Sequence, residues 1–117
     1  MTSSIDHPAH YNSRDIGYEC IALTKHQYFC AGNTIKYLWR YQSKGNPVED
    51  LKKARWYAQE AATRHERVDT TGRCGLILRR LITSTTGPER AVWHCVSRSD
   101  WHLAIELLNR MIEKEDE

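Results

Sequence analysis

The fold depends most on residues 26–66, which read HQYFCAGNTIKYLWRYQSKGNPVEDLKKARWYAQEAATRHE. From about residue 26 to 42, apolar residues recur at steps of three and four, the spacing of an amphipathic helix. Gly32 interrupts this pattern at a cost of about 1 kcal/mol relative to alanine, so we expect another backbone or a ligand to approach it closely. Residues 43–47 then form a turn.

The clearest helix start in the chain follows this turn. Asn46 suits the N-cap position, Pro47 suits the first helical position, and Glu49 stands three residues after the cap. We predict a helix from Val48 to about Glu66, with a stripe of small residues that allows close packing against another helix. Because the turn is short, the two helices should be antiparallel neighbours.

The rest of the chain predicts shorter elements. A short helix is expected over about residues 16–23. A last helix should follow a cap at Ser99 and run over residues 100–114, with an apolar surface wide enough for burial on two sides, such as a subunit interface. Periodicity cannot decide between helix and a small strand pair for residues 74–96. The predicted fold class is mainly α, a compact helical domain built on two long antiparallel helices.

Length and composition limit the class of protein. With 117 residues and a mass of 13.7 kDa, the chain should form one domain, 1–117. It has 40% hydrophobic and 27% charged residues, as soluble globular proteins do. No signal peptide and no apolar run of about 18 residues is visible, so we expect a cytoplasmic protein without a membrane span. A domain of this size buries a modest core, so we expect a homo-oligomer.

Charge is distributed unevenly along the chain. The net charge is +2, which does not indicate a nucleic-acid partner. The last five residues carry a net −3, so residues 1–112 carry +5, and the excess of Lys and Arg lies between Lys36 and Arg80. The sequence therefore predicts a basic centre and an acidic end.

Polar residues share one face of the first long helix. Asn33, Lys36, Tyr37, Arg40 and Lys44 recur at steps of three and four. The cations suit a phosphate and the aromatic ring suits a nucleobase, which predicts a site for a nucleotide-like anion. A solvated basic face remains the alternative.

The second long helix adds a further polar face. Asp50, Lys53 and Tyr57 share it, and Trp56 lies on the adjacent face. Asp50 either pairs with a cation of the first helix or contacts a ligand. For Trp56 and Tyr57, a place in the core is more typical than a place in a cofactor site.

The N-terminal segment contributes His7 and His10, with Glu19 further along. Pro8 favours an extended or turn conformation there. His-x-x-His together with Cys20 could bind a metal, but the spacing is no recognised zinc signature, and we predict no metal site. A loop that contacts a ligand or caps a helix is favoured, and a general base is a further alternative.

Several familiar motifs are absent from the sequence. The four cysteines form no CxxC pair, which favours small buried thiols. No GxxxxGK[ST] or GxGxxG motif is present. Any phosphate would therefore be bound by side chains on helices.

Several of these segments together are similar to a known family. The matching motifs are Asp6-His7-Pro8-x-His10-Tyr11, Gly17-Tyr18-Glu19-Cys20-Ile21, Phe29-Cys30-x-Gly32-Asn33-x-Ile35-Lys36-Tyr37-Leu38-Trp39-Arg40, Lys44-Gly45 and Glu49-Asp50-Leu51-Lys52-Lys53-Ala54-x-Trp56-Tyr57. Over about residues 5–60 the chain resembles a small family common in bacteriophage genomes, often labelled nucleotide kinase or domain of unknown function. Residues 5–66 form the family-like helical core, whereas residues 68–117 are divergent.

The resemblance implies a phage origin, a location in the cytoplasm of the infected bacterium and contact with nucleotides. It also singles out ten candidate ligand-binding residues. These are His7, His10, Tyr11, Glu19, Asn33, Lys36, Tyr37, Arg40, Lys44 and Asp50.

Three hypotheses follow for the function. The first is a protein that binds a nucleotide-type anion and sequesters a nucleotide-derived signal of bacterial defence against phage. The second is a deoxynucleoside monophosphate kinase without a P-loop, which would need ATP and Mg²⁺, with Asp50 and Glu19 as the candidate metal carboxylates. The third and weakest is an inhibitor that binds nucleic acid or a host protein. The sequence assigns no catalytic residue.

Overall fold

A computed structural model describes residues 14–43 and 45–116, which form six α-helices and no strand. The helices are α1 (Cys20–Thr24), α2 (Phe29–Arg40), α3 (Pro47–Thr63), α4 (Gly72–Thr83), α5 (Gly87–Ser97) and α6 (Trp101–Glu115). The mainly helical fold class is confirmed. The alternative of a strand pair over residues 74–96 is wrong, because this stretch lies in α4, α5 and the loop between them. None of the described helices is both long enough and apolar enough to span a membrane.

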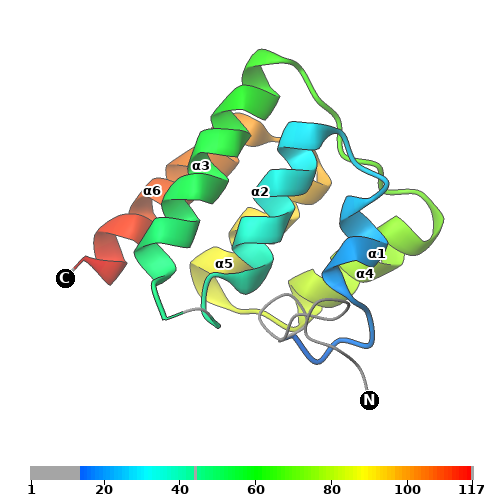
Figure 1. Ribbon diagram of the computed structural model, residues 1–117, viewed down its shortest axis with the longest axis horizontal. Coiled ribbons are helices and arrows are strands. Elements are labelled where there is room, and N and C mark those ends of the chain that lie inside the picture. The colour runs from blue at the N-terminus through cyan, green and yellow to red at the C-terminus, as the bar shows by residue number, and fades with distance from the viewer. Residues whose placement is uncertain (1–13, 44, 117) are drawn as a thin grey trace.

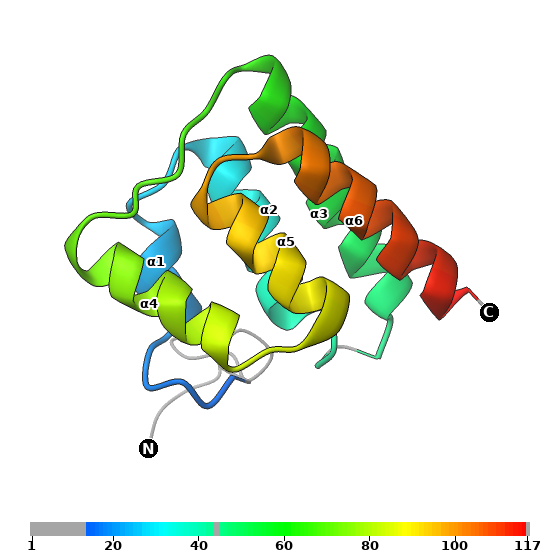
Figure 2. The ribbon, with the colours of Figure 1, turned by 180° about the vertical axis from the view of Figure 1, so that it is seen from behind.

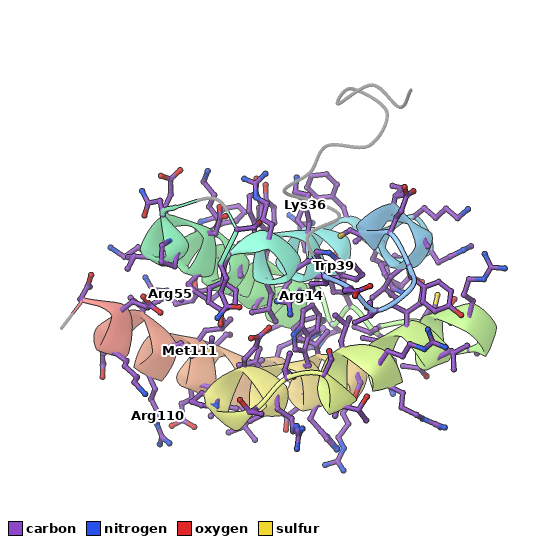
Figure 3. The ribbon with its side chains drawn as sticks, turned by 90° about the horizontal axis from the view of Figure 1, so that it is seen from below. Arg14, Lys36, Trp39, Arg55, Arg110 and Met111 are labelled. Atoms are coloured by element: carbon purple, nitrogen blue, oxygen red, sulfur yellow. The ribbon has the colours of Figure 1, made fainter. Side chains whose placement is uncertain are left out.

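The helices form two layers (Figures 1 and 3). Helices α1, α2 and α3 make one layer, and α4, α5 and α6 make the other. Each helix contacts its neighbour within its layer, and the layers meet where α3 packs on α6 and α1 packs on α4. The chain reverses after α2, and α3 returns beside it (Figure 1). Figure 2 shows α5 lying between α4 and α6 on the other side.

The core lies between these layers. Trp39 of α2 and Trp93 of α5 are its largest fully buried side chains, and Figure 3 shows Trp39 turned towards the second layer. Burial of a Leu or Phe side chain stabilises a fold by about 1.5–3 kcal/mol, and the tryptophan side chain is larger than either. Helix α6 packs against both α3 and α5. The burial on two sides that the sequence predicts for the last helix therefore occurs within one chain. Leu103 of this helix remains 44% exposed.

Two local expectations from the sequence are confirmed. Asn46 caps α3, since its side-chain oxygen accepts a hydrogen bond from the Glu49 backbone N–H at 3.2 Å, and Pro47 is the first helical residue. Gly32 lies against the end of α1: a Cβ atom there would be 3.4 Å from the carbonyl oxygen of Thr24. The backbone at the end of α1 thus approaches Gly32, as expected, at the edge of ordinary van der Waals contact for a larger residue.

The predicted cap of the last helix is wrong by one residue. Asp100 caps α6, because its carboxylate accepts a hydrogen bond from the Leu103 backbone N–H at 3.3 Å. Ser99 instead has a φ of 59°. Its hydroxyl accepts a hydrogen bond from the Val68 backbone N–H at 2.8 Å. Ser99 therefore ties the end of α5 to the chain segment that follows α3.

The four cysteines are buried free thiols, as the sequence predicts. Burial raises the pKa of the Cys20 thiol from 9.0 to about 12, and it raises the pKa values of Cys30, Cys74 and Cys95 as well. The thiolate is the form that reacts with disulfide reagents. The folded protein should therefore resist such reagents.

We expect a thiol-specific disulfide reagent at pH 8 to modify the folded protein much more slowly than the urea-unfolded protein. Because the folded-state pKa values are raised, the thiols contribute stability below about pH 9 that is lost as the pH rises through the folded values. Urea denaturation at pH 8 and pH 10 should show a lower free energy of unfolding at pH 10. Rapid reaction of all four thiols in the folded protein would contradict this interpretation.

Candidate functional site

Three cations surround the ring of Tyr37 on the first layer. From α2, the Lys36 ammonium lies 4.6 Å and the Arg40 guanidinium 4.8 Å from the ring centroid. From α3, the Lys53 ammonium lies 5.4 Å away. Cations within about 6 Å of an aromatic ring are attracted to its face. Two helices therefore bring positive charge to one aromatic side chain.

Further aromatic side chains extend this cluster. Tyr37 stacks on Tyr57, with ring centroids 5.9 Å apart and ring planes at 9°. Tyr57 also makes edge-to-face contacts with Phe29 at 6.0 Å and with Trp56 at 5.0 Å. Phe29 is 72% exposed and Trp56 is 55% exposed. We call the set Phe29, Lys36, Tyr37, Lys53, Trp56 and Tyr57 the cation–aromatic face.

A buried ion pair joins α2 to α3 beside this face. Arg40 Nε lies 3.3 Å from Asp50 Oδ2, and Arg40 Nη2 donates a hydrogen bond to Asp50 Oδ1 at 3.4 Å. The side chains are 7% and 0% exposed, respectively. Of the two roles that the sequence leaves open for Asp50, the structure shows the pairing with a cation of the first helix. The pair holds the Arg40 guanidinium against Tyr37.

Lys53 keeps its positive charge at the edge of the face. Its ammonium donates a hydrogen bond to Glu49 Oε1 at 2.9 Å. This bond raises the pKa of Lys53 above its ordinary value. Both side chains are about half exposed, so the pair contributes little to stability and Lys53 remains accessible to an anion.

A cleft of about 220 Å³ adjoins the face between α1 and α2. Its described lining comprises Thr24, Gln27, Tyr28, Phe29, Gly32, Asn33 and Lys36. Phe29 and Lys36 belong to the cleft and to the cation–aromatic face. The two features therefore form one continuous surface on the outside of the first layer, where Figure 3 shows Lys36 pointing outward.

The structure brings together five of the ten candidate residues, namely Asn33, Lys36, Tyr37, Arg40 and Asp50. Glu19 lies at the N-cap position of α1 and is partly exposed. The described residues do not include His7, His10, Tyr11 and Lys44. They also do not include the N-terminal segment around Pro8, for which the sequence predicts an extended or turn conformation.

Sequence reasoning left four residues of the face out of the ligand-binding set: Phe29, Lys53, Trp56 and Tyr57. The interpretation of Trp56 as a core residue is wrong, since its side chain is 55% exposed. Tyr57 is half-buried and packs at the edge of the core. The spacing of Asp50, Lys53 and Tyr57 already placed them on one helical face. The contact of Tyr57 with Tyr37 depends on the register of the two helices.

Two larger clefts lie elsewhere, between the end of α3 and the start of α6. They measure about 320 and 460 Å³ and share Ala62, His65 and His102. Within residues 14–43 and 45–116, no three His, Cys, Asp or Glu side chains gather closely enough to hold a metal ion. The convergence of cations and aromatic rings thus distinguishes the α2–α3 surface from these clefts.

Comparison with known proteins finds one matching family model and no activity. No curated protein and no solved structure matches the chain. A protein family of unknown function, DUF3310, matches residues 5–59, which include α1, α2 and most of α3 and therefore the whole cation–aromatic face.

Proposed function

We propose that this protein binds a nucleotide on the cation–aromatic face and does not catalyse a reaction of it. The observation that carries the proposal is the convergence of Lys36 and Lys53, from two helices, on the ring of Tyr37. Ammonium groups bind phosphate, and exposed aromatic rings stack on nucleobases. A nucleotide is an anion and an aromatic ring in one molecule, so it matches both halves of the surface.

The ion pair favours binding over kinase chemistry. A magnesium-dependent kinase needs carboxylates that can reach a metal ion between phosphates. Asp50, one of the two carboxylates suggested for that role, is fully buried and paired with Arg40. Sequestration of a nucleotide-derived signal of bacterial defence against phage is the biological role that we attach to such binding.

Calorimetric titration of the protein with each deoxynucleoside monophosphate tests the proposal directly. Lys36→Ala and Lys53→Ala should each weaken binding by about tenfold, because each removes one charge-assisted contact to phosphate. Lys25→Ala and Lys52→Ala remove exposed lysines that do not approach Tyr37, and they serve as matched controls. Equal affinity in all four variants would contradict the proposed site.

Trp56 provides an independent optical signal. Of the four tryptophans, Trp39, Trp93 and Trp101 are at most 4% exposed, whereas Trp56 is 55% exposed. Nucleotide binding should protect its fluorescence from acrylamide, and Trp56→Phe should remove this effect while it keeps an aromatic ring.

Incubation with ATP, Mg²⁺ and each monophosphate distinguishes binding from catalysis. Recovery of intact nucleotide after heat denaturation supports sequestration. Multiple turnovers to the diphosphate would overturn it in favour of the kinase. Binding to oligonucleotides with no affinity for mononucleotides would instead favour a nucleic-acid partner.

A further inference from the structure

The cleft between α1 and α2 has the size of one part of a nucleotide. Small-molecule sites usually enclose about 300–1,000 Å³, whereas this cleft holds about 220 Å³. Tyr28 and Phe29 line it and are 65% and 72% exposed, respectively. Aromatic walls of this kind suit a flat nucleobase, whose phosphate would then extend onto the adjoining cation–aromatic face.

Two polar side chains of the cleft, those of Gln27 and Thr24, already have hydrogen-bond partners in the fold. Gln27 accepts a hydrogen bond from the Asp69 backbone N–H at 2.7 Å and donates one to the Asp69 carbonyl oxygen at 3.1 Å. The Thr24 hydroxyl donates to the Cys20 carbonyl oxygen at 3.3 Å. These side chains therefore shape the cleft rather than bind a ligand.

Asn33 differs from them, because only the nitrogen of its side-chain amide forms a hydrogen bond. Its Nδ2 donates a hydrogen bond to the Phe29 carbonyl oxygen at 2.8 Å. Since a carbonyl oxygen can only accept, this bond determines which end of the amide is nitrogen. Asn33 Oδ1 forms no hydrogen bond within the described part of the chain, so an oriented acceptor remains for a ligand.

Lys36 belongs both to the cleft and to the pair of lysines, Lys36 and Lys53, that we propose to bind phosphate. It lines the cleft and also lies 4.6 Å from the centroid of the Tyr37 ring. Asn33 and Lys36 are three residues apart on α2 and therefore share a face. One ligand can contact both, with its base at Asn33 and its phosphate at Lys36.

We propose that the α1–α2 cleft is the base-recognition part of the site, with Asn33 Oδ1 accepting a hydrogen bond from an N–H group on the base edge. This inference rests on the proposed function, because it assigns the base of the nucleotide whose phosphate contacts Lys36 and Lys53. The ligand class is a nucleotide with an N–H donor on its base edge, rather than a sugar phosphate or a polyphosphate.

Methylated nucleotides test this assignment. We compare dAMP with N6,N6-dimethyl-dAMP, and dTMP with N3-methyl-dTMP, by calorimetric titration. For the unaltered protein, methylation should weaken binding of at least one pair by about tenfold, because it removes the donor that faces Asn33. Deoxyribose 5-phosphate should bind more weakly than either parent nucleotide.

The variant Asn33→Ala separates hydrogen bonding from a steric effect of the methyl groups. The Asn33 side chain is partly exposed and bonds only within its own helix, so the variant should stay folded, which circular dichroism checks. It should bind the parent and methylated nucleotides equally. In Lys36→Ala all nucleotides should weaken together, with the discrimination retained.

The outcomes also separate this inference from the proposed function. Nucleotide binding without discrimination, or discrimination that persists in Asn33→Ala, overturns the role of Asn33 and leaves the proposed function intact. Deoxyribose 5-phosphate binding as tightly as the nucleotides overturns the base-recognition cleft. Absence of binding by every nucleotide overturns both.

Discussion

Replacing Arg40 by alanine is expected to lower the free energy of unfolding by about 3–5 kcal/mol. Asp50 is fully buried, and Arg40 holds both of its carboxylate oxygens at 3.3–3.4 Å. Without the guanidinium, a charged carboxylate would be left in the interior next to α2. Urea denaturation followed by far-ultraviolet circular dichroism measures the loss.

A double-mutant cycle separates the ion pair from lost packing. Arg40→Ala combined with Asp50→Ala should be much less destabilising than the sum of the single changes, because no charge is left buried alone. Lys52→Ala, which removes an exposed cation from α3, should change the stability by less than about 0.5 kcal/mol. A loss below about 1 kcal/mol for Arg40→Ala would show that the pair is not held as described.

The ion pair also determines how binding data on Arg40 are interpreted. Because Arg40 is only 6% exposed, weaker nucleotide binding by Arg40→Ala could reflect a disturbed α2–α3 contact rather than a lost contact to phosphate. Lys36 and Lys53 are better probes, since both are partly exposed and their removal leaves no buried charge.

The elements that the sequence predicts well are those with local signals. The start of α3 is encoded within four residues, by an Asn cap, a Pro at the first position and a Glu at the third. The start of α4 is not, because Thr71 makes no side-chain capping bond and Gly72 and Gly75 disfavour helix. The sequence therefore leaves helix and strand pair open for residues 74–96, whereas α4 begins at Gly72, before that stretch.

Other features depend on contacts between distant residues. Ser99 bonds to Val68, which is 31 positions away, so sequence spacing alone suggested it as a helix cap. The candidate site also depends on a contact between distant residues. The spacing along each helix places Tyr37 and Tyr57 on polar faces, but only the packing of α2 on α3 makes their rings stack.

The second large effect is expected at Glu89, in the first turn of α5. The residue is only 8% exposed, and its carboxylate accepts hydrogen bonds from three side chains. The donors are Arg14 Nη2 at 2.5 Å, the Tyr41 hydroxyl at 3.1 Å and Trp93 Nε1 at 3.1 Å. Arg14 also donates to the carbonyl oxygens of Leu38 and Trp39. Glu89 thus joins the segment before α1, the end of α2 and the second layer.

Glu89→Gln should therefore lower the free energy of unfolding by about 3–5 kcal/mol, although it preserves the shape of the side chain. The amide would direct an N–H group towards one of the donors, and the Arg14 guanidinium would lose its counter-charge. Glu106→Gln, at an exposed position on α6, is the matched control and should change the stability by less than about 0.5 kcal/mol.

The titration of Tyr41 gives a second measurement of the same network. Burial, followed by the Glu89 charge, raises the pKa of Tyr41 far above its ordinary value. Since the folded-state pKa is raised, Tyr41 contributes stability that is fully present below about pH 10 and is lost at higher pH. Glu89→Gln should lower the pKa of Tyr41 towards its ordinary value, as the ultraviolet absorbance of tyrosinate would record, because the neighbouring negative charge is gone. An unchanged Tyr41 titration together with unchanged stability would show that Glu89 is not the acceptor that links these segments.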